Sequence, residues 1–243
     1  GGPRSADGGT TKFSFEDRTA AINISGSQSI LVPWKQYSDT SDHPNCVEIR
    51  VNSDTRQDQT FVSSSLWSVG VEHTSGTNAV LKLTVSDPTG SYSVTSSQFP
   101  FYNDEYTQII VTRNTNSFNV YGKEAFQGRI RSEVSASLEL EGHIWQTDTT
   151  LKIGGYNFTG SVDEFRYWTT PLSESRMDNH TLMPDAIDGN HHSSSTEDLI
   201  YRLDFEYPKD RSSDGDVYIK NVSINEGYGE PFATASGFTS ISE

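Results

Sequence analysis

The sequence is poor in cysteine, and this scarcity excludes one means of stabilisation. Cys46 is the only cysteine among 243 residues, so no disulfide framework can form within the chain. The residues around Cys46 show no C-x-x-C motif, which argues against a thiolate metal site there. The fold must therefore be held by its core.

Basic residues and long apolar runs are also scarce. Lysine and arginine together number 18 against 33 aspartates and glutamates, giving a net charge of −15 without any basic cluster. Nucleic acid and anionic membranes are therefore unexpected partners, because both attract a basic face. No apolar run approaches the roughly 18 residues of a membrane-spanning helix, so no membrane insertion is expected.

What the chain does contain is typical of a β protein. Only 33% of its residues are hydrophobic, but they include 12 Phe, 11 Tyr and 4 Trp. Leu81, Leu83 and Val85 alternate with polar residues, and Val47, Ile49 and Val51 do the same. Apolar periodicity of helix length is absent. We count roughly 12 to 14 strands, which favours two curved antiparallel sheets of six or seven strands each.

The most informative stretch is residues 151–179, LKIGGYNFTGSVDEFRYWTTPLSESRMDN. Two β-type segments flank a glycine-containing turn, and Phe165, Tyr167 and Trp168 make the second segment aromatic, as in a half-buried strand. Pro171 ends this strand, and Ser173 is placed to cap one short helix near residues 172–179.

This order of residues resembles the diagnostic segment of laminin-G-like, or concanavalin-A-like, jelly-roll domains. The matching residues are Phe158, Gly160, Val162, Asp163, Glu164, Arg166, Tyr167, Trp168, Pro171, Leu172 and Ser173. The resemblance implies an all-β fold, a two-sheet antiparallel jelly-roll sandwich of the concanavalin-A-like type. It implies less about function, because this sandwich hosts lectins, adhesion modules, glycosidases and spacers.

A later segment, LIYRLDFEYP at 199–208, resembles a strand that often follows such a helix in large phage tail and fibre proteins. We expect residues 1–10 to be a flexible N-terminal linker and 11–207 to form the laminin-G-like sandwich. Residues 208–243 are then a C-terminal extension or the start of a following domain.

The resemblance also implies a Ca²⁺ site. In related sandwiches the aspartate at the position of Asp163 binds calcium with backbone carbonyls near the first strand, which makes Glu16 and Asp17 its candidate neighbours. Carboxylate and carbonyl oxygens are the ligands that calcium prefers. The alternative is structural: Asp163 accepts backbone N–H bonds at the turn, and Glu164 pairs with Arg166.

Carbohydrate binding would require exposed aromatic rings that stack on sugars. Aromatic residues near predicted loops are Trp34, Tyr37, Trp67, Tyr102 and Trp145. Of these we select Trp34, Tyr37, Tyr102 and Trp145 as candidate sugar-binding residues. The alternative for each is a place in the core, which aromatic residues dominate in sandwiches.

Catalytic signals are weak. Retaining glycosidases on this fold need two carboxylates about 5 Å apart, and the E-x-D-x-x-E pattern that supplies them is missing. The nearest substitute is the pair Glu139 and Glu141. His191 and His192 near Asp188 lie in a serine-rich loop and fit a solvated segment better than a metal site.

These observations favour a non-enzymatic structural or adhesion module of a larger assembly, such as a phage tail, baseplate or fibre protein. Its expected place is the virion or extracellular surface, its expected partners are other subunits of the assembly, and it can contact surface glycans. The alternative is a Ca²⁺-dependent carbohydrate-binding lectin domain. A degenerate glycoside hydrolase is the third hypothesis.

Overall fold

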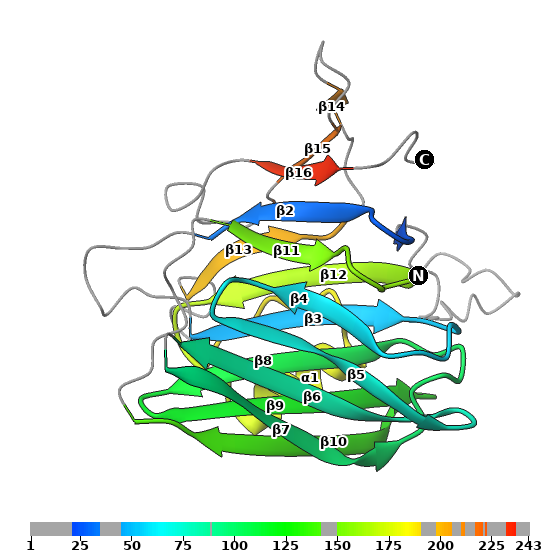
Figure 1. The fold of residues 1–243 in the computed structure, drawn as a ribbon. Helices are drawn as coiled ribbons and strands as arrows, with labels where there is room; N and C mark the ends of the chain where they lie inside the picture. The colour runs from blue at the N-terminus through cyan, green and yellow to red at the C-terminus, as the bar shows by residue number, and fades with distance from the viewer. Residues whose placement is uncertain are drawn as a thin grey trace, which may run out of the picture.

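The computed structural model describes residues 21–34, 45–87, 89–141, 150–190, 198–205, 210–211, 217–220, 222 and 232–236. These residues hold sixteen strands and one helix, and the strands form two antiparallel sheets that face each other (Figure 1). The predicted all-β jelly-roll sandwich with one short helix is confirmed. The strands are more numerous than the roughly 12 to 14 expected for such a sandwich.

Sheet A contains seven strands, with the order β1-β12-β3-β8-β9-β10 and with β13 also paired to β12. Its strands are β1 (Ile22–Ile24), β3 (Cys46–Asn52), β8 (Thr107–Asn114), β9 (Ser117–Phe126), β10 (Arg129–Glu139), β12 (Gly160–Trp168) and β13 (Leu199–Leu203). Strand β12, which contains Gly160 to Trp168 of the resemblance, thus lies inside the sheet. It pairs with β3 along one edge and with β1 and β13 along the other.

Sheet B contains nine strands in the order β14-β15-β16-β2-β11-β4-β5-β6-β7. Its strands are β2 (Ser29–Pro33), β4 (Gln59–Ser63), β5 (Trp67–Ser75), β6 (Asn78–Asp87), β7 (Gly90–Phe99), β11 (Thr150–Gly154), β14 (Asp210–Arg211), β15 (Val217–Lys220) and β16 (Phe232–Ser236). Because β16 pairs with β2, this sheet continues beyond residue 207.

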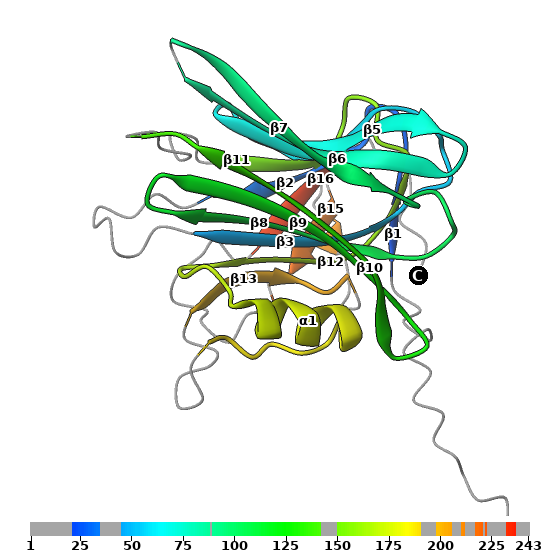
Figure 2. The same cartoon turned by 90° about the horizontal axis from the view of Figure 1, so that it is seen from below.

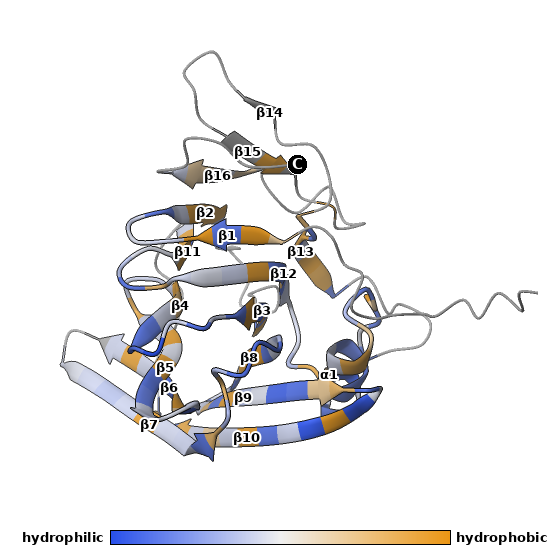
Figure 3. Ribbon diagram, turned by 90° about the vertical axis from the view of Figure 1, so that its right-hand side faces the viewer, coloured by the Kyte–Doolittle hydropathy of each residue, from blue (hydrophilic) through white to orange (hydrophobic). Residues whose placement is uncertain are grey.

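The core lies between the two sheets and follows the alternation in the sequence. Leu81, Leu83 and Val85 are each 0% exposed, whereas the residues between them on β6 are partly exposed. Aromatic rings join the layers: Trp34 contacts Tyr167 with ring centroids 5.2 Å apart. Figure 3 shows the resulting mixture of apolar and polar positions along the strands.

The turn at Gly26 connects the two layers. The sequence predicts two strands joined there, and the turn exists, with φ of 60° at Gly26. However, β1 pairs with β12 of sheet A, while β2 pairs with β11 of sheet B. The turn therefore carries the chain from one sheet to the other and does not close a hairpin.

Helix α1 (Glu174–Leu182) covers the outer face of sheet A, on the side away from β5, β6 and β7 (Figure 2). Ser173 occupies the N-cap position with extended backbone angles, but its side chain makes no capping hydrogen bond. The backbone N–H of Ser173 donates a hydrogen bond to Asn190 Oδ1 at 2.8 Å. The described part of the chain contains no helix that is both long and apolar enough to span a membrane.

Candidate functional site

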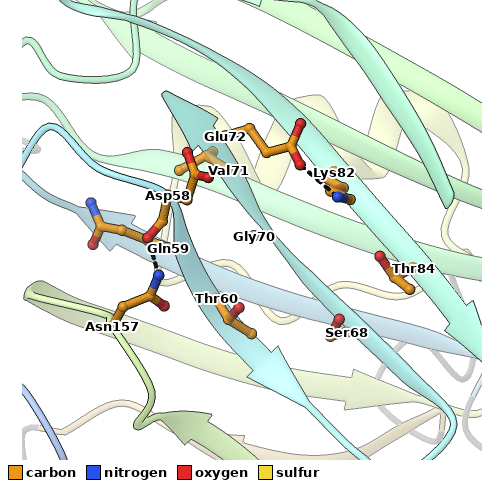
Figure 4. Close-up of a pocket in the computed structure, with 10 residues that line it drawn as sticks. All are labelled: Asp58, Gln59, Thr60, Ser68, Gly70, Val71, Glu72, Lys82, Thr84 and Asn157. Atoms are coloured by element: carbon orange, nitrogen blue, oxygen red, sulfur yellow. Dashed lines mark hydrogen bonds and ion pairs between the residues drawn. The ribbon is translucent and has the colours of Figure 1, made fainter. Parts of the chain in front are cut away.

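A hollow of about 290 Å³ opens on the outer face of sheet B (Figure 4). It lies over β4, β5 and β6, and two further lining residues are Asp58, directly before β4, and Asn157, in the turn between β11 and β12. The lining residues are Asp58, Gln59, Thr60, Ser68, Gly70, Val71, Glu72, Lys82, Thr84 and Asn157. We call this hollow the sheet B pocket.

Local geometry explains why the sheet is hollowed at this point. The pairing of β4 with β5 shifts between Thr60 and Val62, so β4 bulges beside Gly70. A Cβ atom placed on Gly70 would lie 1.9 Å from the backbone oxygen of Gln59. Only glycine therefore lets the β4 backbone approach so closely, and the missing side chain helps to leave the pocket open.

Polar groups of several kinds line the sheet B pocket. Lys82 Nζ lies 2.5 Å from Glu72 Oε1, and Asp58 Oδ1 accepts a hydrogen bond from the His73 backbone N–H at 2.9 Å. Three hydroxyl side chains complete the lining: Thr60, Ser68 and Thr84. A lining of hydroxyl, carboxylate and ammonium groups suits a ligand that both donates and accepts many hydrogen bonds, as a sugar does.

An exposed aromatic residue stands beside the pocket, in the turn between β11 and β12. Tyr156 is 70% exposed, and Lys152 Nζ lies 4.9 Å from the centre of its ring. The neighbouring Asn157 lines the pocket. Sequence reasoning missed Tyr156, although the Gly154-Gly155-Tyr156-Asn157 turn between two strands was a usable signal for an aromatic side chain at a surface turn.

The aromatic residues predicted to bind sugar have different surroundings. Trp34 is 1% exposed and Tyr102 is 4% exposed, and Trp67, which was also considered, is 2% exposed. Tyr102 Oη donates a hydrogen bond to the Gln57 backbone oxygen at 2.6 Å. The prediction is corrected for Trp34 and Tyr102, because rings packed in the core offer no face to a sugar. Tyr37 and Trp145 lie outside the described residues.

Asp163 forms a buried ion pair with Arg50. The aspartate is 1% exposed, its Oδ2 contacts Arg50 Nη1, and the same guanidinium lies 4.7 Å from the centre of the Tyr106 ring. Among the described residues no three or more His, Cys, Asp or Glu side chains gather as a metal site would need. Asp163 is therefore engaged with a cationic side chain, and the calcium site stays a prediction.

The other residues of the metal prediction, Glu16 and Asp17, lie outside the described residues. Arg166 Nε donates to Glu164 Oε1 at 2.9 Å, which is the pairing that the structural alternative predicted. Arg202 Nε also donates to Glu164 Oε1, at 2.5 Å, so this carboxylate joins β12 to β13.

We expect EDTA to leave the melting temperature of the protein unchanged, because Asp163 already has a cationic partner. Replacing Asp163 by Ala should destabilise the protein by roughly 3 kcal/mol, since it leaves Arg50 without its buried partner. A thermal melt with EDTA, with added Ca²⁺ and with neither measures both effects. A wild-type melting temperature that falls in EDTA, while the variant ignores EDTA, would instead establish the calcium site.

A second group of charges is sealed beneath helix α1. Glu48, Arg166 and His180 are each 0% exposed. Glu48 accepts a hydrogen bond from Trp168 Nε1 at 2.8 Å and lies 3.0 Å from His180 Nδ1. His180 Nε2 lies 3.0 Å from the Asp188 backbone oxygen, so each ring nitrogen faces an oxygen atom.

These contacts determine the charge state of Glu48. Burial alone would raise the pKa of Glu48, but the charge and hydrogen bond of His180, the charge of Arg166 and the hydrogen bond from Trp168 outweigh it. Together they lower the pKa from 4.5 to about 2. In the described part of the chain these side chains are buried, and their contacts join α1 to sheet A.

The remaining candidates are on the surface or outside the described residues. Glu139 ends β10, and both Glu139 and Glu141 are exposed at the margin of sheet A, away from the sheet B pocket. His191 and His192 lie outside the described residues. The Asp188 carboxylate lies 3.7 Å from Arg176 Nη1. Of the described positions, Glu139, Glu141 and Asp188 add no group to the sheet B pocket.

The sheet order, the helix after β12 and the aromatic core define a jelly-roll sandwich of the laminin-G-like, concanavalin-A-like class. No family model matches the sequence, and no curated protein matches it either. The comparison with known proteins therefore rests on solved structures.

Solved structures with the same fold include a phage protein. Tailspike protein 2 of the Escherichia coli O157:H7 bacteriophage CAB120 matches with a TM-score of 0.50 and 9% identity, over 77% of this chain and 29% of the tailspike chain. The LG1-3 region of the laminin α2 chain matches with a TM-score of 0.45 and 13% identity, over 65% of this chain and 32% of the laminin chain.

A pentraxin from Limulus polyphemus matches with a TM-score of 0.43 and 14% identity, over 68% of this chain and 84% of the pentraxin chain. The chain thus covers about a third of the laminin and tailspike structures. At 9% identity the tailspike match shows the fold alone, a sandwich of the kind found in a phage tail protein.

Proposed function

We propose that this chain is a non-enzymatic structural and adhesion module of a larger assembly, and that it contacts surface glycans through the sheet B pocket. The assembly is an extracellular or virion structure such as a phage tail, baseplate or fibre. The fold shared with a phage tailspike supports the assembly. Its other subunits are then the main protein partners.

The observation that carries the glycan proposal is the lining of the sheet B pocket. Hydroxyl groups of Thr60, Ser68 and Thr84 stand beside the Asp58 carboxylate and the Glu72–Lys82 pair on an open sheet face. Polar groups held by paired strands are oriented before a ligand arrives, which lowers the entropy lost on binding.

The proposed mode of glycan binding differs from that of a calcium-dependent lectin. The polar side chains that line the pocket act by hydrogen bonding or charge, and Asp163 is engaged with Arg50. We therefore propose that binding is independent of Ca²⁺. Glu139 and Glu141 belong to the margin of sheet A, which supports a protein that binds glycans without cleaving them.

Removing single polar groups from the pocket should weaken glycan binding. Asp58→Asn keeps the oxygen that accepts the His73 N–H but removes a charged acceptor, and Thr84→Val removes a hydroxyl at nearly constant shape. Each change should raise the Kd about tenfold, as expected for the loss of one good hydrogen bond. Calorimetric titration with neutral cello-, malto-, manno- and chito-oligosaccharides, each with EDTA present, measures the effect.

Asp104→Asn is the matched control. It removes one negative charge outside the sheet B pocket, in a second hollow lined also by Asn23, Asn52, Asp54 and Ser161. The backbone at Asp104 has φ of 64°, which asparagine tolerates equally well. Equal losses in Asp104→Asn and Asp58→Asn would move the site to the second hollow. Release of reducing ends from any of these oligosaccharides would show an enzyme.

A further inference from the structure

Resting on the glycan-binding function proposed above, we infer that Tyr156 is a sugar-stacking residue and that the ligand is a neutral oligosaccharide of at least three sugar residues. One end of this ligand occupies the sheet B pocket, and it extends across β4 and β11 to the Tyr156 ring.

The backbone of Tyr156 is in a conformation that disfavours tyrosine. Its φ is 56°, and it follows Gly154 and Gly155 with φ of 70° and 73°. Glycine or asparagine would adopt this left-handed conformation at a lower cost. With 70% of its surface exposed, the Tyr156 side chain gains little from packing to offset that cost. A strained, exposed aromatic residue is a signal of function.

The turn that carries Tyr156 is tied firmly to its surroundings. Gln57 Nε2 donates to the Asn157 backbone oxygen at 2.6 Å, and Asn157 Nδ2 donates to the Asp58 backbone oxygen. The Gly155 backbone N–H donates to the Gln28 oxygen at 2.7 Å, and the next aromatic residue, Phe158, is 0% exposed. The ring of Tyr156 is thus presented by a fixed turn, which a stacking platform requires.

Strand register places Lys152, whose Nζ lies 4.9 Å from the centre of the Tyr156 ring, on the same sheet face as the pocket. Lys152 of β11 pairs with Ser63 of β4, and Ser63 pairs with Ser68 of β5. Directly paired residues project to the same face, and Ser68 lines the pocket. Two strand spacings of about 4.8 Å put Lys152 roughly 10 Å from Ser68. Since a pyranose unit is about as long as one strand spacing, a ligand that reaches both places needs at least three residues.

Charge favours a neutral ligand. Asp58 and Glu72 carry negative charges in the pocket, and Lys82 and Lys152 carry positive charges beside it. The site is therefore balanced, while the whole chain carries −15. The long-range field repels acidic polysaccharides, and no surplus of cations in the site compensates for it.

Two substitutions separate a binding role from a structural one. Tyr156→Asn suits the left-handed backbone, so we expect the melting temperature to stay constant or to rise by about 2 to 4 °C. The same variant should bind a tetrasaccharide at least tenfold more weakly than the wild type, while its affinity for a monosaccharide stays unchanged. Tyr156→Phe keeps the ring and should bind within threefold of the wild type. Tyr92→Ala, which removes another exposed tyrosine on β7, is the control.

The probes are neutral cello-, malto-, manno- and chito-oligosaccharides of one to six residues, together with oligogalacturonates of the same lengths. The inference holds if affinity increases from the disaccharide to the tetrasaccharide in a neutral series and if Tyr156→Asn abolishes that increase. Wild-type affinity in Tyr156→Asn, or preference for the oligogalacturonates, would overturn it while leaving the pocket function intact. Failure of the wild type to bind any probe overturns the proposed function and this inference together.

Discussion

Replacing Glu48 by Gln is expected to destabilise the protein by roughly 3 to 5 kcal/mol, the range for breaking a fully buried ion pair. Glu48 accepts hydrogen bonds from Trp168 Nε1 and faces His180 Nδ1, and Arg166 Nη1 lies 3.7 Å away. Glutamine has the same shape, but the hydrogens of its amide group would point at one of these donors. The substitution would also remove the negative charge that compensates the Arg166 guanidinium. Urea denaturation followed by circular dichroism measures the loss.

Glu72→Gln is the matched control, because it breaks an ion pair that is partly exposed. The side chains of Glu72 and Lys82 are 39% and 36% exposed, so their pairing should contribute less than about 1 kcal/mol. If Glu48→Gln and Glu72→Gln reduce stability equally, the buried cluster is not what holds α1 to sheet A.

The same cluster should make the wild type sensitive to acid in a defined pH range. The pKa of Glu48 is lowered in the folded state from 4.5 to about 2, so its contribution is complete above pH 4.5 and disappears as the pH falls toward 2. This lowering corresponds to roughly 3 kcal/mol of folding free energy. The stability difference between the wild type and Glu48→Gln should therefore shrink over that range, and a constant difference would contradict the role of Glu48.

The fold was predictable because its signals are local. Period-two alternation at Leu81, Leu83 and Val85 specifies which face of β6 is buried, whatever the rest of the chain does. Likewise the run from Phe158 to Ser173 contains the strand, the stop at Pro171 and the start of α1 within sixteen positions. The turn at Gly26 was also recognisable from the sequence. That it leads from one sheet to the other was not predictable, because residues distant in sequence determine which strands pair.

The environment of polar and aromatic side chains was less predictable. Glu48 alternates with Val47 and Ile49, a pattern that indicates a solvated polar face, yet α1 covers it with His180 from 132 positions away. Trp34 and Tyr102 flank loops in the sequence but are buried between the sheets. Burial of these residues depends on contacts that are remote in sequence, which no local pattern records.

The sheet B pocket was invisible in the sequence for the same reason. Its lining comes from β4, β5, β6 and the turn before β12, and its shape depends on a bulge in β4. Gly70 stands in an alternating strand pattern with Val69 and Val71, but the sequence does not show which backbone passes beside it. The structure requires glycine at position 70, because the β4 backbone occupies the space that a side chain there would need.

Gly70→Ala should therefore destabilise the protein by roughly 3 kcal/mol, a large effect for one methyl group. The added Cβ would lie 1.9 Å from the Gln59 oxygen and 2.9 Å from the Thr60 Cα, and both are backbone atoms that cannot rotate away. The β4 strand must shift, and the shift displaces Asp58 and Thr60 from the pocket. Urea denaturation measures the stability, and oligosaccharide titration should show weaker binding in the folded variant.

Gly90→Ala provides the comparison, because it adds the same methyl group at the start of β7. The nearest atom to its added Cβ is Tyr92 Oη at 3.6 Å, which is an ordinary contact. Its stability should therefore stay within about 0.5 kcal/mol of the wild type. If Gly70→Ala is as stable as Gly90→Ala and still binds, β4 can move away from β5 without loss, and the bulge beside Gly70 does not define the pocket. If only Gly70→Ala loses both stability and binding, the close approach of these two strands is what builds the site.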